Sequence, residues 1–485
     1  MPRALIIGGG AAGLGAALLC RRLGLEVLLL EAAPALGPLI RGFKRQGLAF
    51  ETGFHYAGGL AEGGVLHRYL DRLGLFRAGL QTMPLPDPGG ETLRLGRGED
   101  AEWRIPHGLA AFRSLFPVSA ALDAFFAESA AIVSGSPFLN GRFVPGQNWP
   151  VLDEETTLAE KLASLELPDR LRTLLGFRCL LYGPLPAEAG WTDFALVNTP
   201  FLEGTHTFVE GGAGLARAFE AALSEAGVEA RTGRQVVTLE VNSRGEAVGL
   251  AARRADGAME REAGDFLVYC ANPAALPGLL PAGALRPVLI RRLAGLRPTR
   301  PPFMVFASAG TGCFERRQLF LGPDESLDNW LAPDSGLVYF SGGPGRGGRW
   351  PVTIIGPLPE AATALWRGSR PEARPAEYEA FKRRRAEAVV QSVLDRCPEF
   401  KGDLEIIASA TDLTLTRYCF AQGGGIYGRL HGPGQPPLWP VTRIRGLALA
   451  GQDILLPGLL GVLVSAALAV GSLTGFEGLG EVLGA

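Results

Sequence analysis

Residues 3–31 are RALIIGGGAAGLGAALLCRRLGLEVLLLE, and this stretch decides the fold class. The apolar run at 3–7 predicts a short buried strand, the glycines after it predict a tight turn, and a helix is expected through residue 23. A second apolar run at 26–30 predicts another strand, which ends at Glu31. A strand, a helix and a strand within about thirty residues are typical of a βαβ unit in a parallel sheet.

The pattern G-x-G-x-x-G occurs three times, at residues 8–13, 343–348 and 423–428. Only the first lies between a predicted strand and a predicted helix, with an acidic residue at the end of the next strand, as a dinucleotide site requires. Gly8 would permit the tight turn, Gly10 would let backbone amides approach a pyrophosphate, and Gly13 would let helix and strand pack closely. The second occurrence predicts a hairpin turn, and the third also lacks a following helix.

The glycine turn serves both NAD and FAD, so the choice depends on other residues. Glu31 is placed to accept hydrogen bonds from the adenosine ribose, and its charge would repel a 2′-phosphate. Near the other end of the chain, Gly451-Gln452-Asp453 follows a predicted strand and precedes a helix start that contains Gly461. Asp453 could accept from a ribityl hydroxyl, which NAD lacks, although taken alone such a residue is more often a helix N-cap. The two elements together favour FAD.

Composition excludes several classes of function. The 485 residues are enough for two to three structural units, and 47 Lys+Arg against 49 Asp+Glu argue against a nucleic-acid binder. The six cysteines are scattered without a C-x-x-C pair, which argues against a metal site or a disulfide framework and fits the cytoplasm. The glycines at 8–10 interrupt the first apolar run, so no signal peptide is expected. The uncharged stretch 454–475 is long enough to span a bilayer, but Pro457, Gly458 and Gly461 favour a buried helix instead.

The stretch 5–59 resembles the flavin amine oxidase-like superfamily, and within it the phytoene desaturase, carotenoid isomerase and retinol saturase group. The motifs that carry the resemblance are Ile7-Gly8-Gly9-Gly10-Ala11-Ala12-Gly13, Glu31, Gly37, Gly47–Tyr56, Gly211-Gly212-Ala213, Cys270-Ala271-Asn272-Pro273, Arg417-Tyr418, Gly425-Ile426-Tyr427-Gly428 and Gly451-Gln452-Asp453. Two residues depart from the family pattern, since Pro38 replaces a glycine and Glu51 replaces an aspartate.

The resemblance implies further residues of an FAD site. Ala11, Ala12, Gly53 and Ala271 would line it, and Val236 would present its backbone to adenine. Arg41 is a candidate for a phosphate contact. His55, Tyr56 and Tyr427 are candidates for the wall of the flavin and substrate site, but His55 could equally be a hydrogen-bonded structural residue and Tyr427 could merely complete a glycine-rich turn.

The cofactor motifs lie in three separate parts of the chain. We therefore expect an α/β fold in which residues 1–61, 206–284 and 441–485 form a Rossmann-like FAD-binding domain around a parallel sheet. Residues 62–205 and 285–440 would form an inserted mixed α+β domain for the substrate.

The resemblance implies an FAD-dependent oxidoreductase that acts on carbon–carbon double bonds of a hydrophobic isoprenoid or polyene, of the saturase or cis-trans isomerase type. A carotenoid desaturase of the phytoene type is the alternative enzyme, and a prenyl-lipid binding protein without catalysis, of the escort-protein type, is the alternative of another class. The electron donor or acceptor is left open by the sequence.

An apolar substrate suggests peripheral contact with a membrane. The candidate surface is 109–116 with 121–138, where Phe112, Phe116, Phe125 and Phe126 are closely spaced. The competing interpretation is that these side chains line an internal tunnel.

Overall fold

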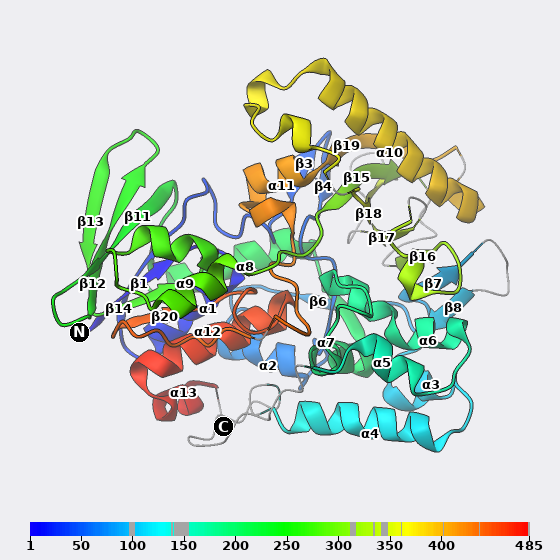
Figure 1. Ribbon diagram of the computed structural model, residues 1–485, viewed down its shortest axis with the longest axis horizontal. Helices are drawn as coiled ribbons and strands as arrows, with labels where there is room; N and C mark the ends of the chain where they lie inside the picture. Colours follow the sequence, from blue (N-terminus) through cyan, green and yellow to red (C-terminus); the bar gives the residue numbers. More distant parts are fainter. Residues whose placement is uncertain are drawn as a thin grey trace.

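The computed structural model describes residues 1–96, 102–136, 139, 155–310, 317–332, 335–340, 348–359, 361–400, 402–435 and 437–483. Two large sheets organise this part of the chain, one on the side of the N-terminus and one on the opposite side (Figure 1).

The first sheet is parallel throughout and contains the predicted βαβ unit. Its strand order is β10 (Glu229–Arg231), β2 (Glu26–Leu30), β1 (Arg3–Ile7), β14 (Phe266–Tyr269) and β20 (Leu447–Leu449). Helix α1 (Ala11–Arg22) connects β1 to β2. The strands come from the beginning, the middle and the end of the chain, which confirms the Rossmann-like α/β architecture.

Side chains of β1 alternate between two hydrophobic cores, as the two-residue period of a strand requires. Ala4 and Ile6 face a core built with α1, α8 (Gly211–Glu225), α12 (Gly458–Thr474) and α13 (Phe476–Leu483). Leu5 and Ile7 face a second core, which is closed by α9 (Pro287–Ala294) and by the antiparallel sheet of β11 (Arg234–Val241), β12 (Ala247–Arg254) and β13 (Met259–Ala263). Both faces of the parallel sheet are therefore covered.

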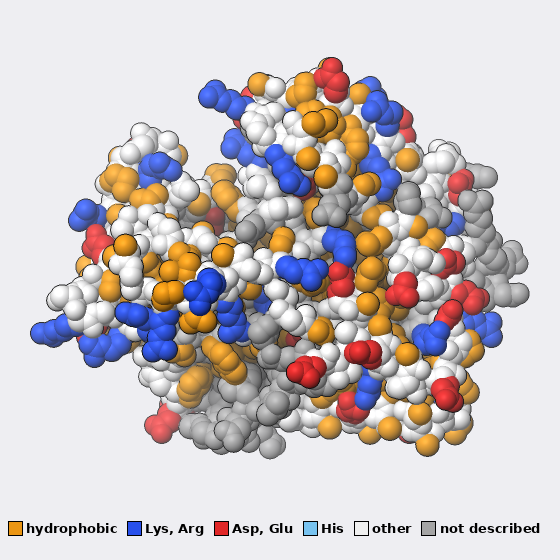
Figure 2. All heavy atoms as spheres, viewed as in Figure 1, with side chains coloured by type: hydrophobic (Ala, Val, Ile, Leu, Met, Phe, Trp, Pro, Cys, Tyr) orange, Lys and Arg blue, Asp and Glu red, His pale blue; other side chains and the backbone are white. Residues whose placement is uncertain are grey.

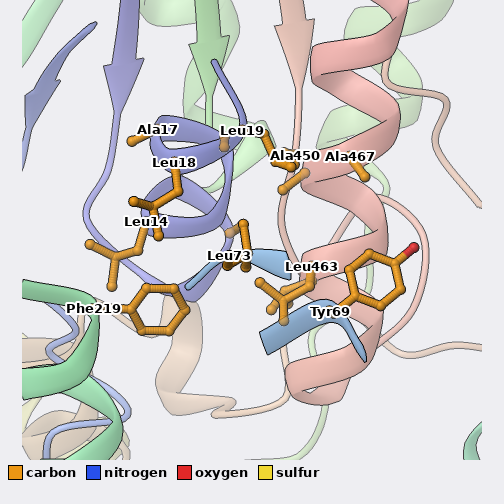
Figure 3. Close-up of a cluster of buried hydrophobic side chains, with 14 of the residues drawn as sticks. Leu14, Ala17, Leu18, Leu19, Tyr69, Leu73, Phe219, Ala450, Leu463 and Ala467 are labelled. Carbon is orange, nitrogen blue, oxygen red and sulfur yellow. The ribbon is translucent and has the colours of Figure 1, made fainter. Parts of the chain in front are cut away.

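Helix α12 is the buried apolar helix expected from the uncharged stretch near the C-terminus. It packs along α1, and Figure 3 shows its Leu463 beside Leu73, in the same cluster as Leu14 and Leu18. A Cβ at Gly15 would lie only 2.8 Å from the Leu463 side chain, which shows how closely the two helices approach. Within the described part of the chain, every helix is too short or too polar to traverse a bilayer.

The second sheet has seven strands and joins the two insertions. Its order is β19 (Glu405–Ala410), β15 (Pro302–Ala309), β18 (Trp350–Pro357), β17 (Gly336–Phe340), β16 (Gln318–Gly322), β7 (Glu91–Leu95) and β8 (Glu102–Ile105). β16 and β7 pair in parallel, and the other neighbours are antiparallel. The mixed α+β character predicted for the insertions is confirmed.

Helices cover both faces of this second sheet. Phe306 and Phe320 face a core formed with α3 (Leu109–Arg113), α4 (Ala120–Ser134), α5 (Leu158–Ala163), α6 (Asp169–Gly176), α7 (Trp191–Glu203) and α11 (Asp412–Cys419). Val305 and Leu319 face the long helix α10 (Ala376–Arg396). Two small sheets, β3 (Phe43–Arg45) with β4 (Leu48–Phe50), and β5 (Ala57–Gly58), β9 (Thr205–Phe208) and β6 (Thr82–Pro84), complete the strands.

Helix α2 (Val65–Arg72) follows the predicted domain boundary in sequence, but it packs against helices of the other predicted domain. The boundary after residue 61 assigns it to the substrate unit, but Leu66, Tyr69 and Leu70 pack in the core of α1 and α12. Figure 3 shows Tyr69 beside α12. If the division into two units holds, α2 belongs with the parallel sheet.

The prediction that closely spaced phenylalanines form an exposed membrane-contacting patch is wrong. Phe112, Phe116, Phe125 and Phe126 are at most 8% exposed, and their rings pack on one another. They do not line the large cavity described below either, so they are not tunnel walls. They form the core between α3, α4 and α7, because amphipathic helices bury their aromatic face when a partner is available. Phe138 lies outside the described residues.

Candidate functional site

A cavity of about 610 Å³ extends from the glycine turn after β1 into the insertions. Its walls combine the N-terminal turn, the end of β14, the segment 451–462 and residues of both insertions. The lining is mostly apolar with few charged groups, as in sites for small molecules and cofactors. Residues from both ends of the chain therefore meet at one site.

The glycine turn has the geometry that its sequence predicts. Gly8 has a φ of +104°, in the region that favours glycine, and a Cβ at Gly13 would lie 1.8 Å from the Gly8 carbonyl oxygen. Gly13 therefore packs helix against strand and does not line the cavity. A Cβ at Gly10 would meet nothing within 4 Å, because it would project into the cavity. The turn thus leaves open space for a group to approach the N-terminus of α1.

Glu31 lies at the end of β2 and lines the cavity. Its carboxylate accepts hydrogen bonds from the backbone N–H of Gly9, at 2.5 Å, and of Ala33, at 2.6 Å. Burial raises the pKa of this carboxyl, while the two amides act in the opposite direction. Glu31 therefore holds the glycine turn in place from within, in addition to any ribose contact.

Asp453 lines the cavity on the side of the C-terminal segment. Its Oδ1 accepts from the backbone N–H of Arg429 at 2.7 Å, and the Arg429 guanidinium donates to the Asp453 backbone carbonyl at 2.9 Å. Burial raises the pKa of the Asp453 carboxyl. The Nε2 atom of His431 lies 3.0 Å from the carbonyl of Gln452. Arg429 and His431 therefore fix the turn that presents Asp453.

Most of the predicted cofactor residues line the same cavity. They are Gly8, Gly10, Ala11, Ala12, Glu31, Gly53, Val236, Ala271, Gly451, Gln452, Asp453 and Gly461. Arg41 does not line it, because its guanidinium donates to the Leu36 carbonyl and pairs with Glu220 on α8. Its place in the structure gives it no contact with the cavity.

His55 and Tyr56 both line the cavity. The His55 ring stacks on Tyr339 with centroids 4.0 Å apart, and its Nδ1 lies 3.4 Å from the carboxylate of Glu51. Among the described residues, no group hydrogen-bonds either ring nitrogen. Tyr56 instead donates to Glu91 at 2.7 Å, and Glu91 is held by a two-pronged contact from the buried Arg178. Hydrogen bonding thus fixes the Tyr56 hydroxyl, whereas the His55 ring is held by stacking on Tyr339.

Tyr427, in the second insertion, lines the cavity. A Cβ at Gly183 would lie 3.3 Å from its ring, and a Cβ at Gly428 would lie 2.6 Å from the Asp453 carboxylate. Burial raises the pKa values of Tyr182, Tyr339 and Tyr427, so these phenols stay protonated. Together with His55 and Phe201 they form an aromatic wall.

The sequence did not single out Arg429, His431, Tyr182 or Tyr339. Arg429 directly follows the glycine-rich element that ends at Gly428, which was the one available signal for it. Tyr339 is recognisable as a site residue only once β17 is placed beside β18 in the second sheet.

Comparisons with known proteins agree with this geometry. A family model described as an NAD(P)-binding Rossmann-like domain matches residues 6–73. Human all-trans-retinol 13,14-reductase is 25% identical over 96% of this chain and 84% of its own length. A protein of Danio rerio named inactive all-trans-retinol 13,14-reductase is 24% identical, over 95% of this chain and 83% of its own.

Solved structures share the fold over the whole chain. An oxidoreductase from Methanosarcina mazei superposes with a TM-score of 0.66 at 17% identity, covering 96% of this chain and 98% of its own. Cyclohexylamine oxidase from Brevibacterium oxydans superposes with a TM-score of 0.62 at 16% identity, covering 99% of each chain. The chain therefore contains a Rossmann-like N-terminal region, is similar over nearly its full length to all-trans-retinol 13,14-reductases, and shares the fold of cyclohexylamine oxidase.

Proposed function

We propose that the protein is an FAD-dependent saturase that reduces a carbon–carbon double bond of a polyene. The observation that carries the proposal is the single cavity, which joins the glycine turn and Asp453 to the aromatic wall of the insertions. A reductase that acts on all-trans-retinol is similar over 96% of the chain. A polyene is apolar and offers few groups for hydrogen bonding, which suits the mostly apolar lining.

The residues on the cofactor side fit FAD. The open space at Gly10 and at Gly451 allows a ligand to lie against the backbone, since a Cβ at either position would meet nothing within 4 Å. Glu31 would accept from the adenosine ribose, and Asp453 from the ribityl chain. Bound FAD would supply hydride exchange at its N5 atom, so the protein has to bind, orient and exclude water.

Saturation also needs a proton, and His55 is the best placed donor. It is the only imidazole among the described residues that line the cavity, and the neighbouring phenols are weaker acids because burial raises the pKa values of Tyr339 and Tyr427. With Nδ1 facing Glu51, Nε2 is left to hold a proton at the polyene carbon. His55 would receive its next proton from solvent after the product leaves.

The test starts from the visible spectrum of the purified protein. Bands of bound oxidised flavin are expected, and anaerobic chemical reduction in the presence of all-trans-retinol should yield a dihydro product. In heavy water two deuteriums should enter the product, one from flavin N5, whose hydrogen exchanges with solvent, and one from His55. His55→Gln should keep the flavin spectrum and lower the rate of product formation by about 10²–10⁴-fold.

Other outcomes separate the remaining candidates. Bound flavin that introduces a double bond into a partly saturated isoprenoid, with no dihydro product under reducing conditions, would indicate a desaturase. Protein that binds the polyene without retaining flavin would indicate a lipid-binding protein, and the relative named inactive makes this measurement worthwhile.

A further inference from the structure

The segment of α9 and the loop after it carries an unbalanced charge. Residues 285–300 contain five arginines and no acidic residue, and residues 435–445 contain two more arginines and again no acid. The two segments are in contact, because Arg292 donates to the Pro437 carbonyl at 2.8 Å. We call this region the α9 surface; its arginines are Arg286, Arg291, Arg292, Arg297, Arg300, Arg443 and Arg445.

Part of this charge is not neutralised within the protein. Arg297 and Arg300 share Glu188, and Arg445 pairs with Glu246. Arg286, Arg291 and Arg443 are exposed and form no ion pair with any described residue. Three arginines are therefore available to an anionic partner.

The same surface exposes large apolar side chains. Val288 is 60% exposed, Ile290 38%, Trp439 47% and Val441 66%. The other side of α9 carries Leu293 into the core of the first sheet. Figure 2 shows basic and hydrophobic side chains intermingled over the area that α9 occupies in Figure 1. An exposed mixture of arginine, aliphatic side chains and tryptophan is typical of a surface that lies in a membrane interface.

The α9 surface continues into a mouth of the cavity. Leu296 and Pro298 line the cavity, only a few residues after α9 ends at Ala294, and Pro298 is itself exposed. Phe420 also lines the cavity and is 54% exposed. An apolar path thus leads from the surface to the site.

We propose that the α9 surface docks on an anionic lipid bilayer, with its apolar mouth toward the lipid. The unpaired arginines complement anionic headgroups, while Val288, Ile290 and Trp439 enter the interface. An acidic protein or a nucleic acid would pair with the arginines alone and would leave Val288, Ile290 and Val441 exposed to water. The docking does not depend on the proposed reaction, so vesicle binding and catalysis can fail separately.

Flotation with phosphatidylcholine vesicles, with and without phosphatidylglycerol, tests the proposal. The purified protein should float only with the anionic vesicles, and less at high salt. The triple variant Arg286→Gln, Arg291→Gln, Arg443→Gln should bind them about a hundredfold more weakly, since each arginine contributes about fivefold near such a surface. Val288→Ser with Val441→Ser should weaken the binding that remains at high salt.

A matched triple variant controls for net charge. Arg244, Arg383 and Arg384 are also exposed and unpaired among the described residues, but they lie on other elements, so their change to glutamine should leave flotation unaltered. Equal loss in both triple variants would overturn the proposal, as would protein that ignores anionic vesicles. Apolar variants that bind as tightly as the parent at high salt would instead indicate a purely electrostatic partner, and would also refute it.

Discussion

Two glycines of the same turn have different physical tasks. The space beside Gly10 is open, whereas a Cβ at Gly13 would overlap the Gly8 carbonyl oxygen. A side chain at position 10 would therefore obstruct a ligand in the cavity, whereas a side chain at position 13 would push α1 away from the Gly8 turn.

Gly10→Val should fold normally but purify without flavin. Its backbone, with φ −72° and ψ 176°, is accessible to valine, so the thermal midpoint of the cofactor-free protein should stay close to that of the parent. Gly13→Ala should instead destabilise the fold by about 1–3 kcal/mol or more, because helix and strand must separate. Flavin absorbance and melting curves of the two variants provide the comparison, and stoichiometric flavin in Gly10→Val would refute the assignment of this turn.

His431 makes stability sensitive to acid. Its ring is fully buried, and burial with the nearby Arg429 lowers its pKa well below 6.5. The folded protein therefore keeps His431 neutral, while the unfolded chain takes up a proton below pH 6.5. Folding stability should fall as the pH drops, by up to about 1.4 kcal/mol per pH unit, until the pH reaches the lowered pKa.

The variant His431→Gln isolates this effect. A glutamine amide can still donate to the Gln452 carbonyl, but it does not titrate. The variant should be less stable than the parent at pH 8, because glutamine does not fill the buried site of the imidazole. The difference in stability should narrow as the pH falls toward 5, because only the parent is destabilised by acid. Melting curves across this range measure the gap. A gap that stays constant would show that His431 is not the titrating group.

At the scale of elements, a buried ion pair joins β7 to the helical layer above it. Glu91 on β7 and Arg178, just after α6, are each 2% exposed, and Arg178 also donates to Asn198 on α7. Because Tyr56 donates to the same carboxylate, this pair also supports the wall of the cavity.

Arg178→Met should cost about 3–5 kcal/mol, since it leaves the Glu91 charge buried without a counter-ion. The double variant Arg178→Met, Glu91→Gln should recover part of that loss. The pair of Arg113 and Asp123, whose side chains are 21% and 63% exposed, is the control, and Arg113→Met should cost less than about 1 kcal/mol. Chemical denaturation measures all three, and equal costs for Arg178→Met and Arg113→Met would contradict the role given to the buried pair.

The elements that sequence predicts well are those with local signals. β1, α1 and β2 follow from apolar periodicity and from the glycine turn, and α10 from its long polar run. The phenylalanines of α3 and α4 were misplaced because periodicity marks an apolar face without naming what covers it. The covering partner is α7, which is about 70 residues further along the chain.

At the scale of the whole molecule, long-range pairing explains what the sequence leaves undetermined. No local pattern shows that β7 pairs with β16, more than 200 residues later, or that α2 packs against α12. The glycine turn and Asp453 could be proposed as cofactor residues because each carries its own chemistry, and both line one cavity, but Arg429 and Tyr339 join that cavity only through tertiary contacts.

We propose that the three cofactor segments, together with α2, fold as one unit that needs α12. Removing the chain from residue 458 should expose the α1 face at Gly15 that packs against Leu463, and should yield insoluble protein without flavin. Removing only the chain from residue 476, which contains α13, should be milder because α12 stays in place. Soluble yield and flavin content distinguish the two truncations, and soluble, flavin-loaded protein from the longer deletion would contradict the proposed unit.

The parallel sheet also sets an order of events during synthesis. β1 and its glycine turn leave the ribosome early, but β20, the segment that carries Asp453 and α12 follow more than 400 residues later. At about 5–20 residues per second this delay is roughly 20–90 s. Throughout that time the surface of α1 that α12 will cover has no partner, so the nascent chain is open to aggregation and to chaperones. Capture of the cofactor is consequently one of the last steps, and flavin content becomes a measure of how many chains have been completed correctly.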